Sequence, residues 1–79
     1  MQRYFFDLYE GGIATLDDEG QLFPSRAALG AEIKKILLDV AEDDGNDREE
    51  IEIELHVRDE TGHELSIARL TLRNRWTDA

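Results

Sequence analysis

The chain is short and strongly acidic: its 79 residues carry 9 Lys or Arg against 19 Asp or Glu, a formal net charge of −10. A domain of this size buries only about 60% of the surface that its unfolded chain exposes, so we expect a single domain, 1–79, with a thin core. The lack of cysteine excludes disulfides and thiolate metal sites. The excess of acid argues against nucleic acid as a partner, and the short apolar runs argue against a membrane span, so we expect a cytoplasmic protein.

The first half of the chain predicts a β-hairpin followed by a helix. Residues 2–9 are rich in aromatic side chains and end near the glycine pair at 11–12, which indicates a strand and a turn. Residues 13–16 supply the returning strand. Ser25 can accept a hydrogen bond from the first turn of a helix. Beyond it, apolar residues recur at the three-and-four spacing of one helical face: Leu29, Ile33, Ile36, Leu37, Val40 and Ala41.

The second half predicts a second hairpin. Residues 50–58 alternate strictly between apolar and polar, which is typical of a strand with one buried and one exposed face. Gly62 closes a short loop, and a fourth strand follows over 64–74. Because the apolar positions of this strand change face, we predict a β-bulge near Ala68 and Arg69. This register pairs Val57 with Leu65, Leu55 with Ile67, Ile53 with Leu70 and Ile51 with Leu72, and brings Glu54 near Arg69 and Glu50 near Arg73.

These elements follow the order β-β-α-β-β, which predicts an α+β fold. We expect a four-stranded, mainly antiparallel sheet with one helix packed on one face. The first and third strands are the most apolar, so they belong in the middle of the sheet, in the order 2-1-3-4. The order 1-2-3-4, with the second and third strands parallel, is the alternative. In the first strand, Tyr4, Phe6 and Leu8 share the face that the helix covers.

Four short motifs occur in a characteristic order: Arg3-Tyr4-Phe5-Phe6-Asp7, Asp18-Glu19-Gly20, Phe23-Pro24 with Ala27-Ala28 after it, and Arg58-Asp59-Glu60-Thr61-Gly62. Together they resemble a family of short bacterial proteins catalogued as a domain of unknown function. That resemblance covers nearly the whole chain and implies a fold without an activity, cofactor or catalytic residue. The stretch 4–41 is more distantly similar to HicB-type antitoxins, which implies neutralisation of a toxin; we expect no DNA-binding segment and hence no repressor role.

Candidate metal and catalytic groups are few. The acidic stretch 42–50 suggests calcium, but it lacks the residue order of an EF-hand loop. We interpret it as a solvated acidic loop, with Gly45 ending the helix. His56 is predicted to point outward beside Ser66, several residues from His63, and the pattern supplies no nucleophile or orienting carboxylate. We therefore predict no catalytic residue, no cofactor, no metal ligand and no enzymatic activity.

The uncovered face of the sheet is the surface most informative about function. Exposed aromatic side chains on a sheet usually mark a contact, although the C-terminal tail is an alternative cover for Phe5. The predicted interaction surface consists of Phe5, Tyr9, His56, Arg69, Arg73 and Trp76. There we expect homodimerisation, face to face or edge to edge, or capture of another protein. The alternatives are an antitoxin-like inhibitor of a small basic ribonuclease and, if a pocket lies beside His56, a small-ligand sensor.

Overall fold

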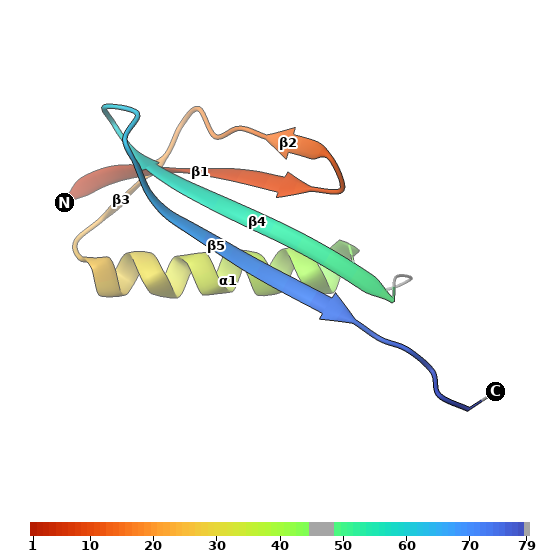
Figure 1. Ribbon diagram of the computed structural model, residues 1–79. Helices are drawn as coiled ribbons and strands as arrows, with labels where there is room; N and C mark the ends of the chain where they lie inside the picture. Colours follow the sequence, from red (N-terminus) through yellow and green to blue (C-terminus); the bar gives the residue numbers. More distant parts are fainter. Residues whose placement is uncertain (45–48, 79) are drawn as a thin grey trace.

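The computed structural model describes residues 1–44 and 49–78 of the chain. Within them, one helix packs on an antiparallel sheet, which confirms the predicted α+β class (Figure 1). The elements are β1 (Gln2–Glu10), β2 (Ile13–Thr15), β3 (Gln21–Phe23), α1 (Arg26–Asp44), β4 (Glu50–Asp59) and β5 (Glu64–Arg73). Residues 45–48 of the acidic segment predicted at 42–50, which include the predicted helix cap Gly45, lie outside the described residues.

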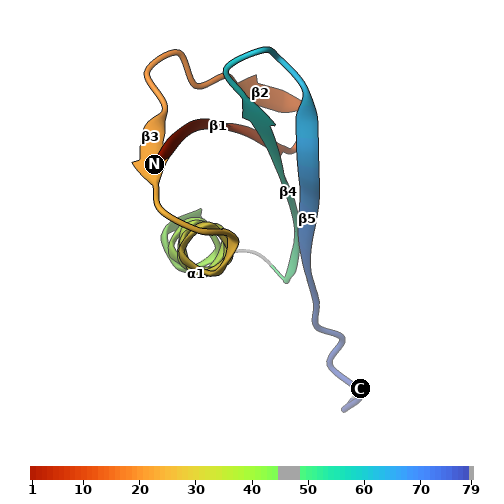
Figure 2. The same cartoon turned by 90° about the vertical axis from the view of Figure 1, so that its left-hand side faces the viewer.

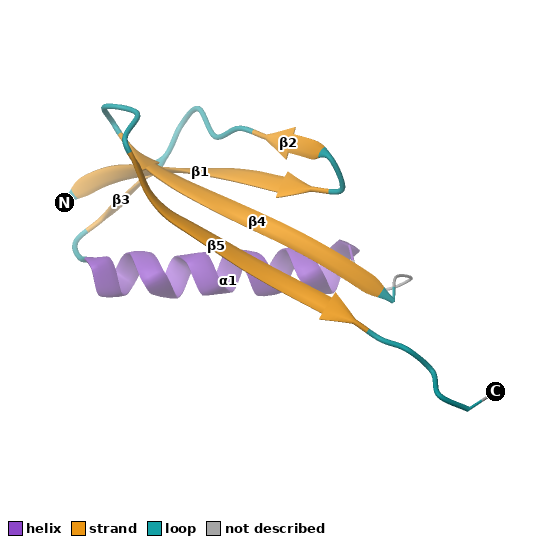
Figure 3. Cartoon of the chain, in the orientation of Figure 1, coloured by secondary structure: helices purple, strands orange, loops and turns teal. Residues whose placement is uncertain are grey.

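The strand order is β2-β1-β4-β5, which is the predicted order 2-1-3-4, because β4 and β5 are the predicted third and fourth strands. Among the described residues, however, the sheet has five strands and not four. The additional strand, β3, lies along the first half of β1, where Gln2 pairs with Phe23 and Tyr4 with Gln21. The second half of β1 pairs with β2. Both short strands are antiparallel to β1, so the chain runs along β1 in one direction from β2 to β3. Strand β1 therefore has β4 on one side and β2 and β3 on the other (Figure 3).

The first hairpin turn follows the predicted chemistry. Gly11 and Gly12 both have positive φ, 56° and 81°, and they join Glu10 directly to Ile13 across the two strands. A two-residue loop with positive φ at both positions matches the right-handed twist of the flanking strands. The glycine pair therefore sets the register of this hairpin.

The helix begins as predicted and covers the concave face of the sheet (Figure 2). The Ser25 hydroxyl accepts a hydrogen bond from the Ala28 amide at 3.2 Å, which satisfies one donor of the first turn. The core lies between this helix and β4, whose Ile53, Leu55 and Val57 are almost completely buried. The other buried apolar side chains are Tyr4, Leu29, Leu37 and Ile51. This small set is the thin core that the chain length predicts.

The second hairpin corrects the predicted position of the β-bulge. Arg58 pairs with Glu64 and Val57 with Ser66, so the extra residue is Leu65, next to the loop, and not Ala68 or Arg69. The Asp59 carboxylate accepts hydrogen bonds from the amides of Thr61 and His63, which closes the loop tightly. The extra residue is the second residue of β5.

This shift places different side chains under the helix. Leu55 pairs with Ala68 and His56 with Ile67, so Ile67 points to the open face and is 56% exposed. The pairs beyond the predicted bulge are confirmed: Ile53 with Leu70, Ile51 with Leu72, Glu54 with Arg69 and Glu50 with Arg73.

The chain exposes a large surface for its mass. Its accessible area is 5963 Å², whereas a folded monomer of 9.1 kDa exposes about 4,900 Å². Its radius of gyration is 14.5 Å, against about 12 Å for a compact domain of this length. Part of the excess comes from the tail after β5, which projects away from the sheet (Figure 1). The remainder reflects a sheet covered on one face by a single helix.

Among the described helical residues, no segment is both long and apolar enough to cross a membrane.

Candidate interaction surface

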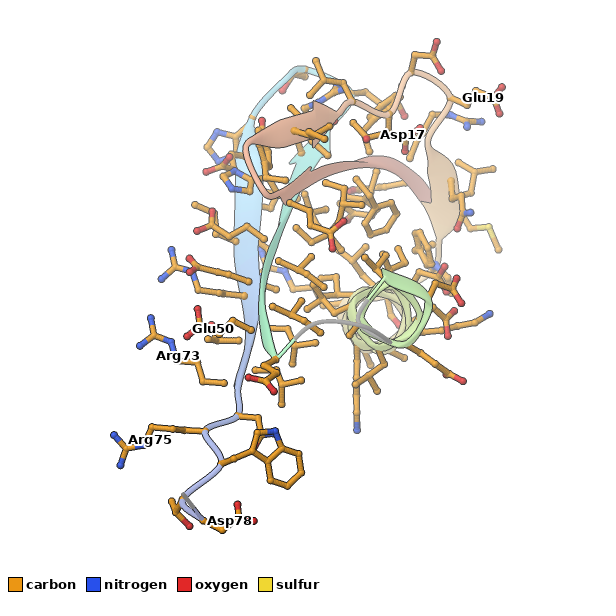
Figure 4. All side chains as sticks on the ribbon, turned by 90° about the vertical axis from the view of Figure 1, so that its right-hand side faces the viewer. Asp17, Glu19, Glu50, Arg73, Arg75 and Asp78 are labelled. Carbon is orange, nitrogen blue, oxygen red and sulfur yellow. The ribbon has the colours of Figure 1, made fainter. Side chains whose placement is uncertain are left out.

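The face of the sheet opposite α1 is open and highly charged. Strand alternation places on it Glu50, Glu52, Glu54 and His56 from β4, and Ile67, Arg69, Thr71 and Arg73 from β5. Figure 4 shows Glu50 and Arg73 on the side of the sheet away from the helix. The acidic strand β4 pairs with the arginine-bearing strand β5, so the negative and positive charges of this face partly compensate each other within the chain.

A row of ionic hydrogen bonds crosses this open face. His56 Nδ1 lies 2.9 Å from Glu64 Oε2, and His56 Nε2 lies 2.9 Å from Glu54 Oε1. Arg69 Nε donates to the other oxygen of Glu54 at 2.9 Å. We call Glu64, His56, Glu54 and Arg69 the charged row. The Tyr9 ring packs against the imidazole, with ring centroids 4.5 Å apart.

The charged row favours a doubly protonated His56. An imidazole can donate a hydrogen bond to both carboxylates only when both of its nitrogens carry a proton. The hydrogen bond to Glu54, and then that to Glu64, raises the pKa of His56 above its ordinary value of 6.5, although partial burial opposes the shift. The same bond, together with that from Arg69, lowers the pKa of Glu54.

These shifts predict how stability depends on pH. Because the folded-state pKa of His56 is raised, its contribution to the free energy of unfolding is complete below about pH 6.5 and is lost as pH rises through the folded-state pKa. We expect NMR titration of the His56 ring to give a midpoint above 6.5, and Glu54→Gln to lower that midpoint. A wild-type midpoint at or below 6.5 would contradict the geometry of the charged row.

An open groove of about 460 Å³ lies beside the charged row. It is lined by Tyr9, Glu10, Gly11, Gly12, Glu52, Glu54 and His56. A deep pocket beside His56 is the condition for the small-ligand alternative, whereas the groove at this position is open and lined by carboxylates. Such a lining attracts cations and repels anions. Among the described residues, no three His, Asp or Glu side chains are grouped so as to hold a metal ion.

A second polar cluster was not predicted, and it anchors the loop between β2 and β3. Asp7 belongs to the open face of β1, but its side chain is buried. Arg58 Nε donates a hydrogen bond to Asp7 Oδ2 at 2.9 Å. Asp7 Oδ1 accepts a hydrogen bond from the Asp17 amide at 3.0 Å. Arg58 also donates to the Asp17 carbonyl at 2.6 Å. We call Asp7, Arg58 and Asp17 the loop anchor.

The Asp17 carboxylate completes the loop anchor. It accepts hydrogen bonds from the backbone amides of Phe6, Glu19 and Gly20, each 3.1 Å long. Burial alone would raise the pKa of Asp17. The three backbone hydrogen bonds and the nearby Arg58 together outweigh burial and hold this pKa below its ordinary value of 3.8. Their stabilising contribution is therefore present above about pH 3.8 and is lost as pH falls through the folded-state pKa.

The loop anchor also covers Phe5, which corrects the predicted exposure of this side chain. The Arg58 guanidinium lies 4.6 Å from the centre of the Phe5 ring. Gly20 approaches the same ring: its φ is +70°, and an added Cβ would meet the Tyr4 carbonyl at 2.8 Å and Phe5 Cε1 at 2.9 Å. Phe5 is thus half-buried by the loop and Arg58, and not by the C-terminal tail.

The remaining predicted surface residues separate into two groups. Tyr9, His56 and Arg69 lie together at the charged row. Trp76 is 71% exposed and donates a hydrogen bond to Glu49 at 2.8 Å, at the end of β4 remote from Phe5. Arg73 pairs with Glu50 near that same end. The six residues therefore do not form one continuous patch.

Comparison with known proteins places the chain in a family. A family model described as "Domain of unknown function (DUF6894)" matches residues 3–71, most of the chain. The chain belongs to this family. The match confirms the predicted likeness to a family of unknown function. The DUF6894 region includes the charged row and the loop anchor, whereas Arg73 and Trp76 follow it. No curated protein and no solved structure matches the chain.

Proposed function

We propose that the chain is a protein-association module without catalytic activity, and that its first partner is a second copy of itself. The observation that carries this proposal is the long outer strand β5, which has a neighbour on one side only among the described strands. A ten-residue strand of this kind presents a row of backbone donors and acceptors to another chain.

The exposed area supports the same proposal. The excess over the expected surface of a monomer is roughly 1,000 Å², of which part belongs to the tail after β5, and each partner in a standard protein interface buries about 800 Å². Exposed apolar side chains on β5 include Leu65, Ile67 and Leu72, which are 37%, 56% and 48% exposed. Their burial would supply the apolar contacts that a homodimer needs.

Sedimentation equilibrium over a concentration series tests this function. We expect the mean mass to rise from 9.1 kDa towards twice that value as the concentration increases. Because each copy carries a net charge of −10, added salt should screen the repulsion and strengthen the dimer. A mass of 9.1 kDa at every concentration up to the millimolar range would rule out self-association.

The second candidate is an antitoxin-like inhibitor that covers a small basic ribonuclease. The observation in its favour is the acidic edge of the open face, where Glu50 and Glu52 are exposed and Glu52 lines the groove. Salt separates this candidate from the first, because an acidic–basic complex weakens as salt rises. The groove beside His56 also supports a sensor for a small cationic ligand, which would shift the NMR signals of Tyr9 and His56.

A further inference from the structure

The outward edge of β5 can be defined residue by residue. The Asn74 amide donates to the Glu49 carbonyl at 2.8 Å, so the backbone groups of Asn74 point towards β4. In an antiparallel ladder, alternate residues direct both their N–H and C=O groups to the same side. Since the register is regular from Ser66 to Arg73, the backbone groups that point away from β4 belong to Ile67, Arg69, Thr71 and Arg73.

This edge differs from the other edge of the sheet. On the far side, β1 is covered by β2 and β3, which are only three residues long each. Short edge strands are a common protection against unwanted pairing. By contrast, β5 has ten residues and contains no proline. Among the described strands, it is the long edge that another strand can join.

From this geometry, and resting on the proposed function, we infer that two copies join edge to edge by antiparallel pairing of their β5 strands. Leu70 lies on the two-fold axis, opposite Leu70 of the second copy. Arg69 then lies opposite Thr71, and Ile67 opposite Arg73. The two sheets become one, with β5 strands at its centre.

Charge selects this register from its neighbours. In a register with Arg69 on the two-fold axis, Arg69 lies opposite Arg69 of the second copy. In a register with Thr71 on the axis, Arg69 lies opposite Arg73 of the second copy. Like charges directly opposite each other destabilise a strand pair. The register centred on Leu70 avoids both clashes. It also lets all the outward backbone groups of 67–73 pair across the interface.

The side chains at this edge suit a second copy. From Leu65 to Thr77 the chain contains three arginines and no acid, so two acidic chains would meet along their least acidic strip. On the helix-facing side, Leu70 meets Leu70 and Leu72 meets Ala68. This contact covers Leu72, which is 48% exposed in the single chain.

Single-cysteine variants test the register directly, because the natural chain contains no cysteine. A cysteine on the two-fold axis lies about 4.5 Å from its copy, measured between Cα atoms, and can form a disulfide. We expect Leu70→Cys to give a covalent dimer under mild oxidation. Arg69→Cys and Thr71→Cys are matched controls, since their copies lie about 7–8 Å apart in this register, and should crosslink at least tenfold more slowly.

A proline variant provides a second test that preserves the core. Thr71→Pro removes a backbone donor that points outward, so the pairing of β4 with β5 stays intact. We expect a monomer with an unchanged circular dichroism spectrum, whereas Thr71→Val should remain a dimer. Preferential crosslinking at 69 or 71, or a Thr71→Pro dimer, would overturn the β5 pairing but leave self-association standing. A wild-type monomer would overturn both.

Discussion

Replacing Ile53 by alanine is expected to lower the free energy of unfolding by about 3–4 kcal/mol. Ile53 is fully buried in β4 and packs in the cluster that contains Leu37, Ile51 and Leu55. Truncation of a buried isoleucine to alanine costs about 2–5 kcal/mol, because apolar contacts are lost and a cavity remains. A domain of this length has a total stability of about 4–12 kcal/mol, so the variant should lose roughly a quarter or more of it. Urea denaturation at fixed protein concentration measures the effect.

Ile13→Ala is the matched control for this experiment. It makes the same chemical change at a side chain that is 71% exposed in β2, and it should cost less than about 1 kcal/mol. Equal losses in the two variants would show that β4 is not the centre of the core. The concentration must be held constant because dimerisation adds to the apparent stability.

Asp7→Ala is expected to have the second largest effect, about 2–3 kcal/mol. The change removes a buried carboxylate that accepts hydrogen bonds from Arg58 and from the Asp17 amide. Each hydrogen bond to a charged group contributes about 1.5–3 kcal/mol, and the partners that remain lose their acceptor. The loop between β2 and β3 should also loosen. Thermal unfolding and amide exchange at Glu19 and Gly20 report these two effects.

Asp18→Ala serves as the control, because it removes an exposed acid from the same loop. We expect a change within about 0.5 kcal/mol. If both variants lose the same stability, the loop anchor contributes no more than an ordinary surface charge.

The long periodic elements of the fold were predictable from the sequence. The helical spacing from Leu29 to Ala41 and the alternation over 50–58 each contain enough repeats to define a face. Strand β3 was missed because three residues, Gln21 to Phe23, carry too short a pattern. The bulge was misplaced because face alternation shows that an extra residue is present but not where it lies: the loop closes with Asp59 opposite His63 whichever residue of the following strand is the extra one.

The candidate site was less predictable, since its contacts join residues far apart in the sequence. The pairing of Glu54 with Arg69 followed from the register and was predicted. The contact of His56 with Glu64 was missed although Glu64 lies opposite Arg58 in both the predicted and the observed register, because a diagonal contact between two strands depends on side-chain conformation. The loop anchor joins Asp7 to Arg58, 51 residues away, and no local pattern signals such a contact. The clue available in the sequence was an acid, Asp7, between the aromatic residues Phe5 and Tyr9 on one face of the strand.

Amide hydrogen exchange of the natural chain, measured at several concentrations, tests the central claim of association through β5 most directly. The amides of Leu70 and Leu72 point towards β4 and should be protected at every concentration. Those of Ile67, Arg69, Thr71 and Arg73 should exchange rapidly in dilute solution and gain protection, on the order of tenfold or more, as the dimer forms. If these outward amides still exchange rapidly when sedimentation shows a dimer, pairing through β5 is contradicted.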